Sequence, residues 1–240
     1  MKFSLRGVIA FALVFTATVV GPSIARAQTA PPGAIWDLST VDSSLGTTYT
    51  QFTTSFVADI TGTEYVSFAF RQVPSFFAFD DAQVYLSTAS SINLLSDPGF
   101  ETATDGQNCN HNNSLGCPTG WSAWIQPIDV SAIGQVATNS DHYGCPIGAN
   151  SGTNFWCDGS VEGYDGIYQA ISTTLGSTYD ISFWLANEEG PTTVPGIDML
   201  VYAGDNIPVG TQNIGTPEPL TFALAGLGLV VLGFRRRRAS

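Results

Sequence analysis

The stretch TYDISFWL at residues 178–185 decides the fold class of this chain. Polar and apolar side chains alternate along it, and aromatic and β-branched residues are prominent, which is the pattern of a half-buried β-strand. The run EYVSFAF at residues 64–70 has the same pattern. Between the two terminal segments we find no amphipathic helix of useful length. The sequence therefore predicts an all-β body with the architecture of a jelly roll or β-sandwich.

A weak internal repeat connects these two stretches. The string GTEY at residues 62–65 corresponds to GSTY at residues 176–179, an offset of 114 residues. We interpret the repeat as two units, a partial β-sandwich at residues 28–90 and a jelly-roll unit at residues 91–210. A lone half-sandwich would leave an unpaired strand edge and an exposed apolar face. We therefore expect the two units to pack together.

The N-terminus, residues 1–27, has the features of a signal peptide. Two basic residues precede an apolar stretch at residues 7–20, and Ala25 and Ala27 are small residues at the positions that a signal peptidase reads. This pattern predicts an N-terminal signal helix, cleavage before Gln28 and export of the protein.

Residues 211–240 form a tail with three ordered parts. A Pro-Glu-Pro motif at residues 217–219 precedes an uncharged run at residues 220–234 and an arginine cluster at residues 235–238. As a helix the run reaches about 22 Å, short of the ~30 Å of bilayer hydrocarbon, so we expect a single, marginal transmembrane helix. The arginines are costly to translocate, which places the N-terminus outside. The tail is either a permanent anchor or a processed sorting signal. The short span and the prolines that precede it favour the sorting signal. The residues of the motif and cluster are Pro217, Glu218, Pro219, Arg235, Arg236, Arg237 and Arg238.

These three parts, in this order at the extreme C-terminus, resemble the PEP-CTERM sorting signal. The same tail also has the label ice-binding protein C-terminal domain, which implies no ice binding here. The resemblance implies recognition by an exosortase and a transient stage in the inner membrane. It further implies a destination at the cell surface or in the extracellular matrix of a Gram-negative bacterium that makes exopolysaccharide.

The body between the terminal segments is strongly acidic. Residues 28–216 contain 19 acidic residues and a single basic residue, Arg71, and therefore carry 18 net negative charges. Such a surface repels nucleic acid and anionic lipid, so we expect no nucleic-acid partner. The acid excess fits an extracellular protein, either because it keeps the protein soluble or because it holds calcium.

The chain has four cysteines, and export brings them into an oxidising compartment. An even number favours two disulfides. Nearest-neighbour pairing joins Cys109 to Cys117 and Cys145 to Cys157, although four cysteines permit two other connectivities. A zinc site that combines these cysteines with the two histidines is disfavoured, because the spacings form no compact ligand pair.

The body also resembles the galactose-binding-like jelly rolls of carbohydrate-binding modules. The strings that carry this resemblance are NLLSDPGFE at residues 93–101, GW at 120–121 and YDISFW at 179–184, and FDDAQV at 79–84 is similar to a closing strand. The resemblance spans roughly residues 49–204, with an aspartate, Asp97, where those modules have asparagine. It implies a structural calcium that joins the opening and closing strands, with Glu101 and Asp198 in the corresponding places. The alternative is that both are ordinary solvated acids.

Aromatic side chains could supply flat faces on which sugar rings lie. Trp124 and Trp156 have polar loop residues as neighbours in the sequence, and with Tyr164 they are our candidate ligand residues. We expect Trp121 and Phe183 to fill the core instead.

The sequence gives little indication of catalysis. It contains two histidines and no Gly-x-Ser-x-Gly motif, and with acids this frequent, a carboxylate pair such as Asp80-Asp81 is expected by chance. We therefore expect a protein that is not an enzyme and has no certain cofactor. The first hypothesis is a structural or interaction role in exopolysaccharide or biofilm, the second is a carbohydrate-binding module with a polysaccharide partner, and the third is an extracellular hydrolase.

Overall fold

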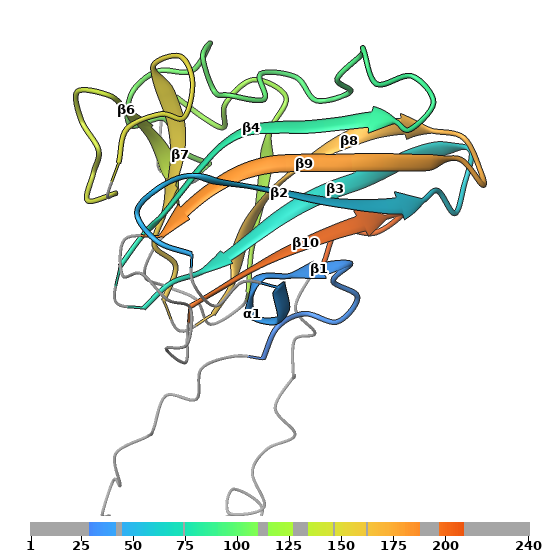
Figure 1. Cartoon of the computed structure of the whole chain (residues 1–240), viewed down its shortest axis with the longest axis horizontal. Helices are drawn as coiled ribbons and strands as arrows, with labels where there is room; N and C mark the ends of the chain where they lie inside the picture. Colours follow the sequence, from blue (N-terminus) through green and yellow to red (C-terminus); the bar gives the residue numbers. More distant parts are fainter. Residues whose placement is uncertain are drawn as a thin grey trace, which may run out of the picture.

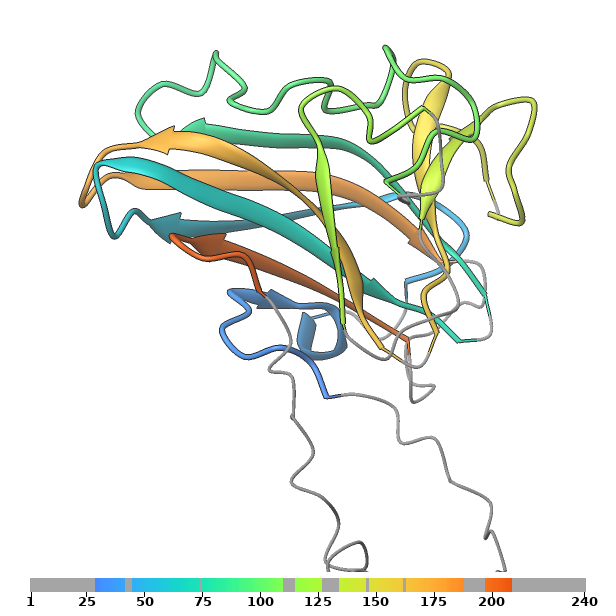
Figure 2. The same ribbon diagram turned by 180° about the vertical axis from the view of Figure 1, so that it is seen from behind.

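The computed structural model describes residues 29–41, 45–73, 75–109, 115–126, 134–145, 147–161, 163–187 and 197–208. These residues form two five-stranded antiparallel sheets that pack face to face (Figure 1, Figure 2). The first sheet, sheet A, has the order β1-β10-β3-β8-β5, and the second, sheet B, has the order β2-β9-β4-β7-β6. The predicted all-β sandwich is confirmed.

The strands of sheet A are β1 (Trp36–Asp37), β10 (Asp198–Gly204), β3 (Gly62–Arg71), β8 (Asp165–Thr173) and β5 (Ser122–Ile125). Those of sheet B are β2 (Thr50–Val57), β9 (Thr178–Asn187), β4 (Phe77–Leu86), β7 (Asn154–Asp158) and β6 (Gln135–Thr138). One helical turn, α1 (Leu38–Val41), follows β1.

The two stretches with the clearest alternation form interior strands of the two sheets, each paired on both sides. β9 pairs with β2 and β4, and β3 pairs with β10 and β8. Their inward side chains meet across the sandwich, where the ring centroids of Phe68 and Phe183 are 5.5 Å apart. Phe79 joins them, 4.8 Å from Phe68 and 5.8 Å from Phe183. Full burial of one such ring contributes roughly 1.5–3 kcal/mol, so this aromatic core accounts for much of the stability.

The expected division into units 28–90 and 91–210 is wrong. In sheet A, β3 lies between β10 and β8, and in sheet B, β4 lies between β9 and β7, so strands from both segments alternate. Hydrogen bonding between strands far apart in the chain therefore produces a single core. The two copies of the repeat lead into β3 and β9, which are interior strands of opposite sheets.

Both described ends of the chain lie beside β10. The backbone amide of Ile35 donates to the carbonyl of Val201 at 2.8 Å, and the hydroxyl of Tyr202 donates to the carbonyl of Pro31 at 2.7 Å. A cavity of about 300 Å³ is lined by residues from both ends, among them Pro31 and Pro208. The first and the last described residues of the body are thus neighbours.

Both predicted disulfides are present. Cys109 is bonded to Cys117 and Cys145 to Cys157. The second bond ties the segment that follows β6 to β7, and the Cys145 and Cys157 side chains lie in an apolar cluster on the outer face of sheet B.

The signal helix at residues 1–27 and the span at residues 220–234 lie outside the described residues. Within the described residues, no helix has the length and apolar character required for a membrane crossing.

Candidate functional site

A polar cluster lies where a bulge interrupts β4. The register between β4 and β9 shifts between Asp80 and Gln83, and Asp81 has a φ of 50°. Beyond the bulge, the amide of Ala82 donates to the carbonyl of Pro98 at 3.1 Å. The bulge thus joins β4 to the segment at residues 93–101, which follows it in the chain.

Asp80 is fully buried at this bulge and accepts three backbone hydrogen bonds. Oδ1 accepts from the amide of Asp81 at 2.7 Å, and Oδ2 accepts from the amides of Asn150 and Ser151 at 2.8 and 3.2 Å. Asp81 accepts from the side chains of the same two residues, each at 2.8 Å. The two aspartates therefore fasten the segment before β7 to the outer face of sheet B.

The environment of Asp80 favours its neutral form. The pKa of Asp80 is raised to about 7, because burial and then the charge of Asp81 raise it by more than the three backbone donors lower it. The Tyr49 hydroxyl is buried nearby with no hydrogen-bond partner among the described residues. Burial and then the charges of Asp80 and Asp81 raise the pKa of Tyr49 above its ordinary value. Removal of a carboxylate from water costs more here than three hydrogen bonds recover.

Gly99, in the opening segment at residues 93–101, lies against the polar cluster. A Cβ atom at this position would lie 3.3 Å from Oδ1 of Asp81 and 3.4 Å from Oδ1 of Asp80. The two carboxyl groups therefore converge on the backbone of this glycine. A larger residue would have to displace one of them.

Glu101 attaches the same segment, just before β7, through a second set of hydrogen bonds. Its carboxylate accepts from the amides of Thr153 at 2.9 Å and Asn154 at 2.9 Å. A Cβ atom at Gly152, which has a φ of 64°, would lie 2.3 Å from Glu101 Oε1. Glycine is therefore required there, both by the backbone conformation and by the close approach of the carboxylate.

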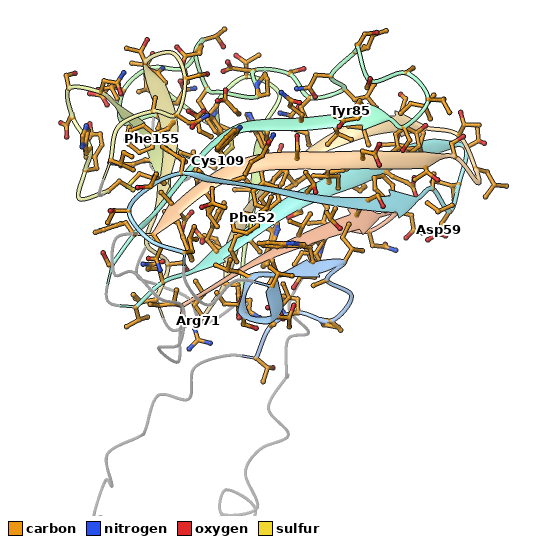
Figure 3. All side chains as sticks on the ribbon, viewed as in Figure 1. Phe52, Asp59, Arg71, Tyr85, Cys109 and Phe155 are labelled. Carbon is orange, nitrogen blue, oxygen red and sulfur yellow. A yellow bond between two sulfur atoms is a disulfide. The ribbon has the colours of Figure 1, made fainter. Side chains whose placement is uncertain are left out.

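Asp198 lies at the start of β10, opposite Arg71 of β3, and accepts from the Tyr164 hydroxyl at 2.7 Å. The pKa of Asp198 is raised to about 6, chiefly by burial, with the hydrogen bond from Tyr164 opposing the rise and the charge of Asp37 adding to it. Arg71, the one basic residue of the body, has its guanidinium 5.7 Å from the centre of the Tyr164 ring. Figure 3 shows Arg71 at one end of the sandwich and Asp59 at the other.

The structure does not bring Glu101 and Asp198 together. Glu101 contacts the Asn154 end of β7, whereas Asp198 belongs to sheet A and pairs with Arg71. The next residue, Gln72, bonds to Ser160, beyond the other end of β7. The expected calcium ligand pair is therefore wrong. Among the described residues, no group of three or more histidine, cysteine, aspartate or glutamate side chains could hold a metal ion.

Sequence reasoning missed Asp80 and Asp81 as the acids that meet the opening segment. The string FDDAQV, which resembles a closing strand, was the signal that could have found them. In this chain the strand of that type, β4, comes before the opening segment at residues 93–101. The sequence therefore predicted Asp198, late in the chain, as the partner of this segment, whereas the structure places β4 there.

The three candidate ligand aromatics are buried and offer no open ring face. Trp124, Trp156 and Tyr164 are 6%, 1% and 3% exposed. The indole N–H of Trp124 donates to Ser67 Oγ at 2.8 Å, and that of Trp156 donates to Asp158 at 2.9 Å. The expectation that these residues stack on sugar rings is therefore wrong, because packing against the sheets uses their faces.

Trp184 is the one tryptophan that stays half-buried. Its neighbours Phe183 and Leu185 point into the core, so Trp184 lies on the outer face of sheet B. In the ladder it pairs with the exposed Gln51 on one side and with the buried Asp80 on the other. A partly exposed aromatic ring beside a polar side chain is an arrangement that suits a sugar.

A comparison with protein-family models identifies the tail. Residues 216–238 match the PEP-CTERM protein-sorting motif. All the predicted sorting residues, from Pro217 to Arg238, fall within this match and outside the described residues. No curated protein and no solved structure matches the chain.

The PEP-CTERM motif makes this chain an exported protein that an exosortase sorts. The match covers the tail alone, so it carries no information on what the body does. The likeness of the body to galactose-binding-like modules stays a prediction.

Proposed function

We propose that the exported body is a structural, interaction-forming protein of the cell surface or exopolysaccharide matrix, and not an enzyme. The observation that supports this is the use of its polar groups. Asp80 and Glu101, two carboxylates of the polar cluster, each accept backbone amides and hold loops in place. Such acceptors stabilise a rigid exported body, and none of this requires a substrate.

The position of the tail supports a role close to the membrane before processing. Pro208 is the last described residue, and the motif begins nine residues later, at Pro217. A fully extended chain of that length spans at most about 30 Å. The folded body is therefore held near the bilayer until an exosortase acts, as expected for a protein transferred directly to the cell surface.

Cell fractionation in the native bacterium tests the destination. We expect the wild-type protein in the surface and matrix fraction, released when the polysaccharide is digested. The matched control ends after Pro208, so it keeps the signal peptide and body but lacks the tail, and we expect it as a soluble protein of the periplasm. A wild-type protein that distributes like this control contradicts the proposal.

The sorting step has a separate test. Glu218→Ala changes the Pro-Glu-Pro motif without touching the span or the arginines, so we expect the uncleaved form to stay in the inner membrane. Export of this variant with the size of the wild-type protein in a strain that has its exosortase would exclude sorting through this motif.

Carbohydrate binding through the outer face of sheet B is a second candidate. The half-buried ring of Trp184 beside the exposed Gln51 favours it. We expect Trp184→Ala to lower the retardation of the protein in gels that contain the native exopolysaccharide. Tyr85→Ala, which removes a half-buried ring from the same sheet, is the matched control. Equal retardation of wild type and Trp184→Ala would exclude this face.

A further inference from the structure

β2 presents a backbone edge that no other described strand pairs with. It is the outermost strand of sheet B, and within the described part of the chain its ladder partner is β9. Beyond its end, the amide of Ala58 donates to the carbonyl of Ser177, in the same register as the ladder. Because antiparallel ladders alternate, even-numbered residues of β2 bond to β9, and odd-numbered residues direct their N–H and C=O groups outward. The outward residues are Gln51, Thr53, Ser55 and Val57.

This edge lacks the features that usually protect a sheet edge. β2 has eight residues and contains no proline, glycine or charge. The other edge strands are shorter, since β1 has two residues and β5 and β6 have four each. Long, regular and uncharged edges are templates for pairing with another strand. Among the described strands, β2 is therefore the edge best suited to accept one.

The charge distribution indicates what kind of strand pairs there. The sequence has no charged residue between Asp42 and Asp59, in a body that carries 18 net negative charges. A basic partner would gain nothing from this neutral stretch. Another acidic molecule, in contrast, can approach here with the least repulsion.

The sequence of β2 is nearly palindromic about Thr54. Phe52 and Phe56 lie at equal distances on either side of it, as do Thr53 and Ser55. A two-fold axis places equivalent residues of the two copies on opposite sides of the interface. An antiparallel pair centred on Thr54 therefore sets Phe52 beside Phe56 of the second copy, and Thr53 beside Ser55.

We propose that two copies of the protein pair through β2, antiparallel and two-fold about Thr54, so that sheet B continues across the interface. The outward groups of Gln51, Thr53, Ser55 and Val57 then all find partners in this register. A single pair of strands buries less area than a standard interface, so the pairing is weak and reversible. It forms where copies are crowded, and it does not depend on the proposed polysaccharide partner.

Sedimentation equilibrium of the exported protein tests the pairing, over a range from about 1 to about 500 µM. We expect the average mass to rise toward twice that of the monomer. Ser55→Asp places a charge on each copy at the interface and should raise the midpoint concentration at least about tenfold. Gln83→Asp adds the same charge on an exposed position of β4, away from the edge, and should change the midpoint little.

Thr53→Pro removes an outward N–H that the ladder with β9 does not use, so it should abolish pairing while the thermal midpoint of unfolding is retained. A wild-type protein that stays monomeric over the whole range overturns the proposal. Equal weakening by Ser55→Asp and Gln83→Asp also overturns it.

Cross-linking tests the register. Thr54→Cys places two thiols directly opposite each other, about 4.5 Å apart between Cα atoms, and should form an intermolecular disulfide under mild oxidation. Val57→Cys is the control, because in this register the thiols of the two copies lie far apart. Cross-linking at Val57 that is as fast as at Thr54 overturns the two-fold pairing.

Discussion

β2 and β4 flank the same strand, β9, and differ in almost every respect. β4 carries a bulge, two aspartates and fully buried inward rings, and side chains and loops cover it. β2 is regular and uncharged, and its inward Phe52 is only half-buried. The comparison shows how an acidic protein with one cation in its body keeps its sheets intact. Carboxylates are placed where backbone amides can satisfy them, and the open edge is left without charge.

Removal of one inward ring from each strand should give the largest difference between them. Phe79 of β4 lies within 6.3 Å of four other aromatic rings, whereas Phe52 of β2 contacts Trp36 and Phe183. Phe79→Ala should cost about 3–5 kcal/mol of unfolding free energy and Phe52→Ala about half as much. Denaturant titration measures both, and equal costs would contradict the view that β2 is the looser strand.

Asp80 should make stability depend on pH. Its folded pKa of about 7 lies above the ordinary value of 3.8, so the folded protein holds a proton that the unfolded chain has lost. Stability is therefore greatest below pH 4 for this group and falls by about 2–4 kcal/mol as the pH rises to 7. Unfolding measured at pH 4.5 and 7.5 should show this fall in the wild type and lose most of it in Asp80→Asn. Asp81→Asn is the control, because burial still raises the pKa of Asp80 in this variant. If the pH dependence disappeared equally in both variants, Asp80 would not be its source.

The disulfide that ties β7 should matter somewhat less than the ring of Phe79. Cys145–Cys157 closes a loop of 12 residues in sequence separation and Cys109–Cys117 one of 8. Loop-closure entropy gives about 3 kcal/mol for each. Replacement of each pair by alanine, followed by thermal unfolding, should give similar losses. A much larger loss for Cys145–Cys157 would show that its apolar surroundings, and not the unfolded chain, determine its contribution.

What could be predicted from sequence was local. The strands β3 and β9 follow from period-two alternation, and the disulfides join cysteines close in sequence, for which closure is easy. The division at residue 90 failed because strand pairing is non-local, and the alternation within a strand does not show which other strand it pairs with. Trp124 and Trp156 were placed in loops from their polar neighbours, yet both pack against sheets whose positions only the pairing reveals. The calcium pair failed for the same reason, since the order of strands along the chain concealed the meeting of β4 with residues 93–101.

The smallest effect is expected at the edge of sheet A, where β1 pairs with β10. Burial is the main reason that the pKa of Asp198 rises to about 6, and the charge of Asp37 adds to the rise. The folded state therefore favours the neutral form, and ionisation of Asp198 lowers stability as the pH rises from about 4 to 6.

Asp198→Asn keeps an oxygen that can accept from the Tyr164 hydroxyl and removes the charge. We expect it to stabilise the protein by about 1 kcal/mol at pH 7.5 and to have almost no effect at pH 4. Asp205→Asn, at an exposed position just beyond β10, is the matched control and should change stability little at either pH. If Asp198→Asn destabilised the protein at pH 7.5, the prediction would be wrong. The ionised carboxylate and its hydrogen bond from Tyr164 would then stabilise this edge by more than burial and the charge of Asp37 destabilise it.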